Sequence, residues 1–286
     1  MFIADGWKEY EILDATQGER LERWGQYVTV RPDPQVIWKS PRVSPLWEKA
    51  DGVYHRSSSG GGRWENRRLP AQWTLQYRDL TLRVRPMGFK HTGIFPEQAA
   101  NWDFMRDLIR NAGRPVNVLN LFGYTGAASI ACAAEGASVC HVDAAKAMVA
   151  TAKENAQLSG LADRPIRYIT DDCVKFAERE IRRGHRYDGI VMDPPSYGRG
   201  PSGELWKVED DVYALLELCS RLMSDKPLFF LINSYTTGLS PSVMAAMQDL
   251  LLRPALGGKV ECGELGLPVG DRFVVPCGAV SRWTAE

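Results

Sequence analysis

The stretch Val116-Asn117-Val118-Leu119-Asn120-Leu121-Phe122-Gly123-Tyr124-Thr125-Gly126 decides the fold of this chain. It is almost continuously apolar as far as Phe122, as a strand covered on both faces requires. Gly123 and Gly126 then bracket a sharp turn, and the small residues of 127–134 favour a helix that packs close to a sheet. The stretch therefore predicts a buried strand, a glycine turn and a helix. Free backbone N–H groups at the helix start would face a crevice suited to a nucleotide-like ligand.

From residue 116 onward, strand-like and helix-like segments alternate along the chain. The expected strands are 116–122, 138–143, 166–170, 189–193, 228–234, 259–267 and 273–282. The expected helices are 96–112, 126–135, 144–159, 173–183, 208–224 and 240–253. Five strand–helix units followed by two closing strands predict an open, doubly wound α/β sheet.

Residues 1–90 have a different character and lack long helical periodicity. Segment 27–30 alternates like a strand, and segments 73–77 and 80–85 flank Arg78-Asp79 as the arms of a hairpin would. We therefore expect a small β-rich appendage over 1–90, and one α/β domain over 91–286.

Composition places the chain among ordinary globular proteins. Of its 286 residues 44% are hydrophobic and 24% are charged, and the formal net charge is zero. No apolar run approaches the roughly 18 residues of a membrane span, and the first six residues do not resemble a signal peptide. The six cysteines form no CxxC pair and lie mostly in apolar segments. We expect buried thiols, a reducing cytoplasm, no membrane and no metal site.

Acidic residues follow the second and third expected strands. Asp143 stands 20 residues after Gly123, where a carboxylate can accept hydrogen bonds from both ribose hydroxyls of an adenosine cofactor. Asp172 could accept from the amino group of adenine, and the N–H of Cys173 could meet a ring nitrogen. Each aspartate could also cap the helix that follows it, and the two roles are compatible.

The fourth expected strand runs into Asp193-Pro194-Pro195-Ser196-Tyr197. Two prolines stiffen the loop and remove backbone donors, so that it presents carbonyl oxygens. A carboxylate beside such a carbonyl can hold an amino or ring N–H group of a flat substrate, on which Tyr197 can stack. The alternative is a rigid exit from the strand without a chemical role.

Four segments in this order and spacing resemble class I S-adenosylmethionine (SAM)-dependent methyltransferases. They are 118–126 (VLNLFGYTG), 141–143 (HVD), 170–173 (TDDC) and 192–200 (MDPPSYGRG). The chain is more closely similar to bacterial ribosomal-RNA large-subunit methyltransferases and their uncharacterised relatives, whose TG-x-F-x-x-Q pattern segment 92–98 matches. The resemblance covers about 88–286. It implies a seven-stranded Rossmann-like sheet whose last strand is antiparallel, and SAM at the glycine crevice beneath Thr92, Phe95 and Gln98.

The residues and the resemblance together give a set of expected site residues. The expected cofactor-binding residues are Thr92, Gly93, Phe95, Gln98, Asn120, Phe122, Gly123, Tyr124, Thr125, Gly126, Asp143, Asp171, Asp172 and Cys173. The expected catalytic residues are Asp193, Pro194, Pro195 and Tyr197, and the expected substrate-binding residues are Ser196, Asn233, Ser234 and Tyr235.

The chain departs from related enzymes at informative places. Asn120 stands where many class I enzymes carry an acid, and the aromatic residue of the Asp-Pro-Pro loop is fifth rather than fourth. Methylation of carbon 5 of a pyrimidine needs a cysteine nucleophile. Neither segment 232–238 (INSYTTG), where related cytosine methyltransferases carry that cysteine, nor the Asp-Pro-Pro loop contains one. We therefore expect methylation of a base nitrogen.

RNA, most readily ribosomal RNA, is the expected partner. Residues 31–90 hold 12 Lys and Arg against 5 Asp and Glu, interleaved with aromatic residues. Basic groups can meet phosphates and aromatic rings can stack on bases, although the tryptophans could equally form a core. A small molecule or a protein is the alternative substrate, and a non-enzymatic RNA-binding module that keeps SAM as a structural ligand is another. A NAD-dependent oxidoreductase would require G-x-G-x-x-G, whereas this chain offers only Gly123-x-x-Gly126.

Overall fold

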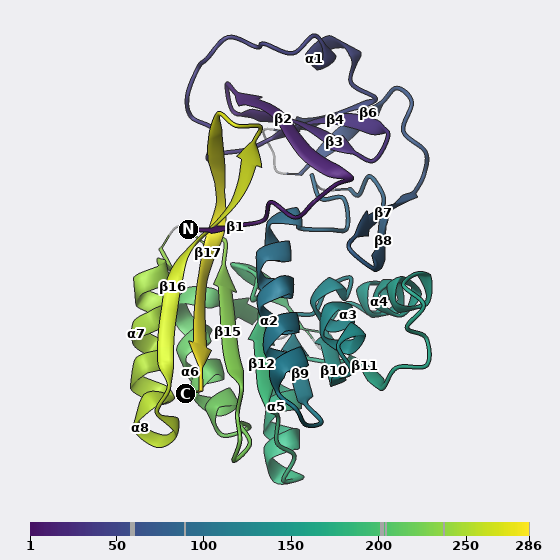
Figure 1. Ribbon diagram of the computed structural model, residues 1–286. Helices are drawn as coiled ribbons and strands as arrows, with labels where there is room; N and C mark the ends of the chain where they lie inside the picture. The colour runs from purple at the N-terminus through teal and green to yellow at the C-terminus, as the bar shows by residue number, and fades with distance from the viewer. Residues whose placement is uncertain (58–60, 89, 201–202, 204, 237, 286) are drawn as a thin grey trace. The chain divides into compact units, whose positions relative to one another are not determined.

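The structure is a computed structural model that describes residues 1–57, 61–88, 90–200, 203, 205–236 and 238–285. The chain forms two compact units (Figure 1). Unit 1 comprises Asn101–Glu264 and Gly278–Glu286 together with Met1, and unit 2 comprises Phe2–Ala100 and Leu265–Cys277. The domain boundary at residue 90 stays a prediction.

The central sheet of unit 1 contains all seven predicted strands. Its order is β16-β17-β15-β12-β9-β10-β11, with β1 added beside the part of β16 that belongs to unit 2. Strands β9 to β12 and β15 run parallel, whereas β17 pairs antiparallel with β15. Their bounds are β1 Phe2–Ile3, β9 Asn117–Leu121, β10 Ser138–Asp143, β11 Ile166–Thr170, β12 Gly189–Met192, β15 Phe229–Ser234, β16 Lys259–Val269 and β17 Phe273–Thr284. The doubly wound sheet and its antiparallel last strand are confirmed, and only the two-residue β1 is an addition.

Helices cover both faces of this sheet, as the alternating sequence pattern predicts. They are α2 Ala99–Asn111, α3 Ala127–Ala134, α4 Lys146–Leu158, α5 Cys173–Arg182, α6 Val208–Ser220, α7 Pro241–Leu251 and α8 Arg253–Leu256. Successive side chains of a strand point to opposite faces. Within β9, Asn120 accordingly meets α3, whereas Leu119 and Leu121 meet the cluster that α5 and α6 line.

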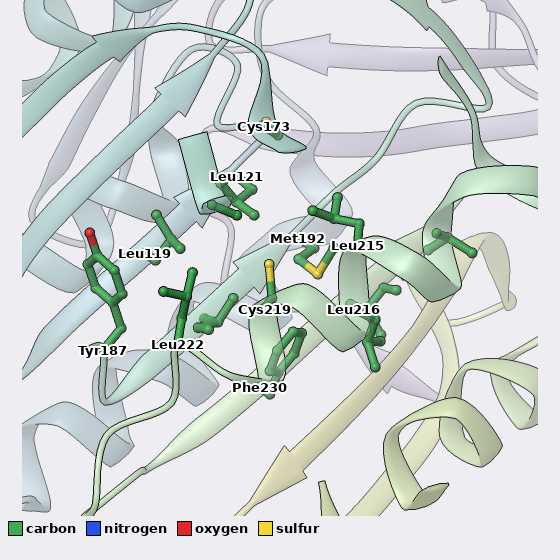
Figure 2. Close-up of a cluster of buried hydrophobic side chains, with 14 of the residues drawn as sticks. Leu119, Leu121, Cys173, Tyr187, Met192, Leu215, Leu216, Cys219, Leu222 and Phe230 are labelled. Carbon is green, nitrogen blue, oxygen red and sulfur yellow. The ribbon is translucent and has the colours of Figure 1, made fainter. Parts of the chain in front are cut away.

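An apolar core of unit 1 lies between the sheet and helices α5, α6 and α7. Figure 2 shows Leu119 and Leu121 of β9 near Met192 of β12 and Leu215 of α6, and all four are fully buried. Burial of such side chains contributes about 1.5–3 kcal/mol each. The core thus fixes the strand ends from which the glycine turn and the Asp-Pro-Pro loop leave.

Unit 2 contains the predicted hairpin and a five-stranded sheet that the sequence pattern did not predict in full. The hairpin is β7 Trp73–Tyr77 and β8 Leu80–Val84, and the predicted strand 27–30 lies within β4. The five-stranded sheet has the order β2-β3-β4-β5-β6. The remaining bounds are β2 Tyr10–Thr16, β3 Glu19–Trp24, β4 Tyr27–Pro32, α1 Leu46–Lys49, β5 Gly52–Arg56, β6 Gly62–Asn66 and the 3-10 turn η1 Pro96–Gln98.

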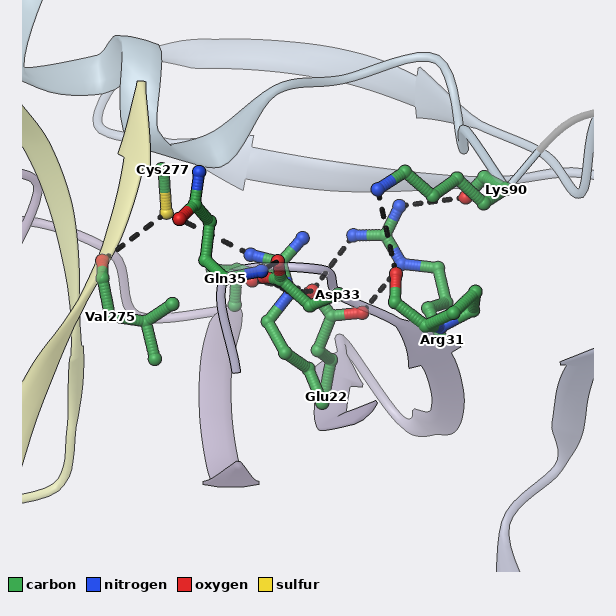
Figure 3. A network of polar contacts seen from close by, with 10 residues as sticks. Glu22, Arg31, Asp33, Gln35, Lys90, Val275 and Cys277 are labelled. Atoms are coloured by element: carbon green, nitrogen blue, oxygen red, sulfur yellow. Dashed lines mark hydrogen bonds and ion pairs between the residues drawn. The ribbon is translucent and has the colours of Figure 1, made fainter. Parts of the chain in front are cut away.

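A buried ion cluster stabilises this second sheet (Figure 3). The Oε2 atom of Glu22 lies 2.6 Å from Nε of Arg31, and Arg20 lies between Glu22 and Asp33. Burial alone would raise the pKa of Glu22, but the guanidinium groups of Arg31 and Arg20 lower it to about 2. Arg31 also donates to the backbone oxygen of Lys90 at 2.8 Å. Charged residues therefore occupy interior positions of this sheet as ion pairs.

Candidate functional site

The glycine turn between β9 and α3 has an unusual backbone. Phe122, Tyr124 and Gly126 have φ values of 56°, 49° and 86°. Positive φ costs a bulky side chain roughly 1–3 kcal/mol, and such residues cluster at functional sites. The turn is held by backbone bonds from Gly123 N to Val142 O and from Gly126 N to Gly123 O, both 2.9 Å long. The predicted turn is present, and two aromatic residues carry its strain.

The two glycines of the turn are required by close neighbours. A Cβ atom on Gly123 would lie 2.4 Å from Nδ1 and Cε1 of His141, the neighbour from β10. A Cβ on Gly126 would lie 2.6 Å from Cβ of Ala152 in α4. Contacts below 3.0 Å force a shift. Gly123 thus lets the turn lie directly against the His141 ring, and Gly126 lets α3 begin against α4.

A buried polar cluster supports the turn from below. Nδ2 of Asn120 donates to Oγ of Ser129 at 2.9 Å, and that hydroxyl lies 3.0 Å from Nδ1 of His141. Burial lowers the pKa of His141 to about 4, so the ring is neutral near pH 7. Asn155 of α4 donates from Nδ2 to the backbone oxygen of Thr125 at 2.9 Å. The side-chain amide of Asn120 is therefore committed to α3, and its cofactor role stays a prediction.

Asp143 at the end of β10 stabilises the same turn from the other side. Its Oδ2 accepts from Tyr124 N at 2.9 Å, and its Oδ1 accepts from Ala145 N at 2.8 Å. Ala145, not Asp143, is the N-cap residue of α4, so the capping alternative for Asp143 is wrong. Burial raises the pKa of the Asp143 carboxyl, against these two hydrogen bonds. Each oxygen keeps a second lone pair, which suits the two ribose hydroxyls of an adenosine.

Asp171 and Asp172, which follow β11, have different structural roles. Oδ1 of Asp172 accepts from Lys175 N at 2.9 Å, so Asp172 caps α5 as the alternative interpretation predicts. Asp171 accepts from Asp172 N at 2.9 Å and forms an ion pair with Arg179. Asp171 N donates to the backbone oxygen of Asp143 at 3.1 Å, which places the two acidic strand ends side by side.

Cys173 lies beneath the turn and is not a reactive thiol. Its side chain is buried and hydrogen-bonds to the backbone of Phe122. Burial raises the pKa of its thiol well above the usual value, and the nearby Asp143 and Asp172 add to that effect. A neutral, buried thiol serves packing here, while its backbone N–H remains the predicted contact to adenine.

The Asp-Pro-Pro loop leaves β12 beside the glycine turn. Asp193 N lies 3.5 Å from the backbone oxygen of Leu121, the last residue of β9. The Asp193 side chain is half-buried and Pro194 is buried, whereas Pro195, Ser196 and Tyr197 are exposed. The structure thus brings the predicted catalytic and cofactor-binding turns to the same edge of the sheet.

Trp206 joins the two turns, and sequence patterns gave no signal for it. Its indole Nε1 donates to the backbone oxygen of Pro195 at 2.7 Å, and its ring lies 5.2 Å from the Phe122 ring. Trp206 belongs to β14 Leu205–Lys207, which pairs antiparallel with β13 Tyr197–Arg199. The exposed Tyr197 is therefore presented on a short hairpin that a buried tryptophan fixes.

Three predicted substrate residues lie at the end of β15, in different environments. Asn233 and Ser234 are buried, with 1% and 2% of each residue exposed, whereas Tyr235 is 39% exposed. Ser234 Oγ accepts from Thr236 N at 3.1 Å, and Thr236 Oγ1 lies 2.5 Å from Oγ of Ser196. The loops after β12 and β15 are thus tied together by a pair of hydroxyls.

Arg282 of β17 fixes the orientation of the Asn233 amide. Its Nε and Nη2 donate to Oδ1 of Asn101 in α2, at 3.0 and 2.6 Å. Nδ2 of Asn101 then donates to Oδ1 of Asn233 at 2.9 Å. Because a guanidinium can only donate, the chain has one polarity and leaves Asn233 Nδ2 as the donor end. Arg282 and Asn101 were not predicted, since only tertiary contact relates them to the site.

The predicted cofactor residues of segment 92–98 belong to unit 2. Thr92 and Gln98 are buried, Gly93 has a φ of 94°, and the Phe95 ring lies 5.2 Å from the His91 ring. The backbone oxygen of Thr92 accepts from Arg85 N at 3.0 Å, which ties the segment to the residue that follows β8. Their role at the cofactor stays a prediction.

These features fit an adenosine-type methyl donor. The turn offers backbone N–H groups at the start of α3, and Asp143 offers a half-buried carboxylate. Over the described ranges, no group of three or more His, Cys, Asp or Glu side chains is placed to hold a metal ion. No helix in the same ranges is both long and apolar enough to cross a membrane.

Comparison with known proteins gives the same assignment. A family model described as S-adenosylmethionine-dependent methyltransferase matches residues 53–241. A solved SAM-dependent methyltransferase from Agrobacterium tumefaciens is 36% identical, with a TM-score of 0.95 over 100% of this chain and 93% of that one. A putative SAM-dependent methyltransferase from Streptococcus mutans, 18% identical, shares the fold with a TM-score of 0.73 over 98% of this chain and 76% of that one.

Curated relatives match a smaller part of the chain. A ribosomal RNA large subunit methyltransferase K/L from Shewanella frigidimarina is 32% identical over 139 residues, which is 48% of this chain. The matched region spans only 19% of that relative's length. The family match excludes the nicotinamide-dependent alternative. The chain, with a glycine turn, a strand-end acid and an Asp-Pro-Pro loop at one sheet edge, belongs to the S-adenosylmethionine-dependent methyltransferase family.

Proposed function

We propose that this methyltransferase transfers the methyl group of SAM to a nitrogen of a base in RNA, with ribosomal RNA as the substrate, in the cytoplasm. The observation that carries the proposal is the composition of the substrate side. The half-buried carboxylate of Asp193, the exposed ring of Tyr197 and the amide of Asn233 suit a flat, N–H-bearing ring.

The cysteines support nitrogen rather than carbon chemistry. Of the six, Cys132, Cys140, Cys173 and Cys219 are buried. Cys173, the thiol beneath the glycine turn, has a raised pKa and is 3% exposed. A carbon-5 pyrimidine methyltransferase needs an accessible thiolate to attack the ring. A base nitrogen needs only to be held in line with the methyl group and shielded from water.

Each part of the site then has a distinct task. Bound SAM supplies an electrophilic methyl group on a sulfonium. The glycine turn and Asp143 hold the adenosine, and Asp193 accepts a hydrogen bond from the amino or ring N–H group of the target base. Two prolines and the Trp206 contact keep the Asp193 loop rigid, and Tyr197 stacks on the base. These contacts contribute by position, which can supply several kcal/mol of barrier reduction.

Residues 1–90 are the proposed RNA-contacting region. Several of their arginines are engaged, since Arg42 pairs with Glu19, Arg67 with Glu65 and Arg68 with Asp51. Arg56 and Arg63 are exposed. Over the described ranges these two have no carboxylate partner, and they are the side chains that we assign to phosphates. The name of the curated relatives, ribosomal RNA large subunit methyltransferase K/L, supports an RNA substrate for the matched half of the chain.

Tritium transfer from methyl-labelled SAM tests the proposal. RNA, protein and small-molecule fractions from a deletion strain are each offered to the purified protein, with Asp193→Ala as the inactive control. We expect label in RNA alone and an N-methylated nucleoside in its digest. Label in protein or in a small molecule would replace RNA as the substrate, and 5-methylcytosine would refute nitrogen chemistry.

A further inference from the structure

A cavity lies at the end of the unit 1 sheet where the parallel strands begin, opposite the glycine turn. Its volume is about 470 Å³, within the usual range of ligand pockets. It is lined by the residues at which β9, β10 and β11 begin, including Asn117, Ser138 and Ile166. β9 is five residues long, so the strand separates this cavity from the glycine turn by roughly 16 Å. The cavity is therefore distinct from the cofactor crevice.

Arginines surround this cavity, and none of its lining residues is acidic. Arg164, Arg167 and Arg186 line it together with His185. Over the described ranges, Arg164 and Arg186 have no carboxylate within salt-bridge distance, and Arg167 reaches only Glu180 at 3.7 Å. Most other arginines of unit 1 are paired, as Arg110 is with Glu135 and Arg253 with Asp249. Unpaired guanidinium groups around one cavity, in a chain of zero net charge, favour an anionic ligand.

A buried carboxylate makes the cavity wall rigid. Glu180 of α5 is fully buried and accepts from the Tyr187 hydroxyl at 2.6 Å. The same carboxylate lies 2.7 Å from Nδ1 of His185. Tyr187 N also donates to the backbone oxygen of Leu222 at 2.8 Å. The wall is thus preorganised, which lowers the entropic cost of binding.

The cavity is also lined by apolar side chains, which indicate what kind of anionic ligand it can bind. Val139, Pro165 and Ile166 line the cavity beside the arginines. An inorganic anion would leave this apolar surface unused, whereas a ligand with a flat ring and a phosphate uses both parts. Guanidinium groups bind phosphate oxygens through paired N–H donors, and they also stack on flat rings.

We propose that this cavity binds a nucleotide unit, with Arg164 and Arg186 on its phosphate. One source of the unit is the RNA substrate itself, at a nucleotide distant from the target base, and this source rests on the proposed function. The other source is a free nucleotide. In both cases this contact contributes binding affinity. Methyl transfer takes place beside the glycine turn, at the other end of the strands.

The test uses the full chain and the double variant Arg164→Ala/Arg186→Ala. The matched control Arg253→Ala/Lys259→Ala removes two positive charges from exposed side chains outside the cavity. Fluorescence anisotropy with a labelled 12-nucleotide single-stranded RNA and calorimetry with adenosine monophosphate measure the two sources. SAM calorimetry confirms that both variants are folded. We expect tenfold or greater loss of RNA affinity at low salt in the cavity variant alone. The salt slope of RNA binding should fall by about 1.4, as loss of two phosphate contacts requires.

Each outcome decides one question. Loss of adenosine monophosphate binding with unchanged RNA binding assigns the cavity to a free nucleotide. Equal affinities of the cavity and control variants for both probes overturn the proposal. If the wild-type protein binds RNA through Arg164 and Arg186 but methylates none, the cavity stands and the proposed RNA methylation fails.

Discussion

Replacement of Gly123 by alanine should both destabilise the protein and weaken its binding of SAM. The added methyl group would lie 2.4 Å from two atoms of the His141 ring. That ring is fully buried and contacts Ser129 of α3, so it cannot turn away freely. Relief of the clash must therefore displace either the ring or the turn. Gly123 has no positive φ, so the effect is one of packing and not of backbone strain.

The magnitude follows from the contacts that must change. Overpacking by one methyl group costs about 1–3 kcal/mol. Displacement of His141 also breaks its 3.0 Å hydrogen bond to Ser129, which is worth about 1 kcal/mol. We therefore expect a loss of about 2–4 kcal/mol in the free energy of unfolding, and at least tenfold weaker SAM binding because the turn itself shifts.

Urea unfolding and SAM calorimetry measure the two effects. Gly238→Ala is the control for stability, because a methyl group there meets nothing within 4 Å and Gly238 has no positive φ. The double variant Gly123→Ala/His141→Ala removes the ring that the added methyl group would meet. Its loss of stability should therefore be smaller than the sum of the losses in the two single variants. Wild-type stability and SAM affinity in Gly123→Ala would refute the packing argument.

Three further predictions concern single carboxylates. Asp143→Ala should weaken SAM binding by about 1.5–3 kcal/mol by calorimetry, since it removes a charged acceptor, and an unchanged affinity would disprove the ribose role. Asp193→Ala should abolish methyl transfer while SAM affinity stays near wild type; collapse of SAM binding would show that Asp193 serves the cofactor instead. Glu22 has a pKa of about 2 in the folded protein against an ordinary 4.5, so its contribution of about 3 kcal/mol is present above pH 4.5 and lost as pH falls toward 2. The free energies of unfolding of wild type and Glu22→Gln, measured between pH 2 and 7, give this contribution. If the two free energies change in parallel with pH, the lowered pKa of Glu22 is contradicted.

The α/β domain could be predicted because its strands are buried on both faces. Segments such as 117–121 and 229–234 are mostly apolar, and helices with clear starts separate them. Ser240, for example, caps α7 with Pro241 next to it, a pattern that sequence alone makes visible. The glycine turn and the four aspartates at the ends of three strands follow from the same strand boundaries.

The sequence predicts a β-rich appendage over 1–90, but most strands of the unit 2 sheet could not be predicted, for a physical reason. In β3, Arg20 and Glu22 are buried in ion pairs, so the alternation of apolar and polar residues that marks a strand is hidden. Partners from neighbouring strands, Arg31 of β4 and Tyr10 of β2, make the burial of Glu22 favourable. Sequence patterns show which side chains are charged, but they do not show which charged residues form ion pairs in the folded protein.

The site residues at the strand ends could be predicted from the sequence. The residues that contact and support them could not. Position 123 must be a glycine because the His141 ring lies against it. The Asp193 loop is held by a hydrogen bond from Trp206, which belongs to a short hairpin. Arg282 reaches the site through an asparagine 181 residues away in the chain. No local spacing relates these residues, because the fold alone brings them together.

The most direct measurement of the central claim is nucleoside mass spectrometry on RNA from a deletion strain and its parent, with the deletion-strain RNA also treated in vitro with purified protein and SAM. We predict one N-methylated nucleoside that is absent from the deletion strain and restored by wild-type protein, but not by Asp193→Ala. Identical nucleoside profiles in the two strains, with no methyl group added to RNA in vitro, would contradict an RNA-methylating role.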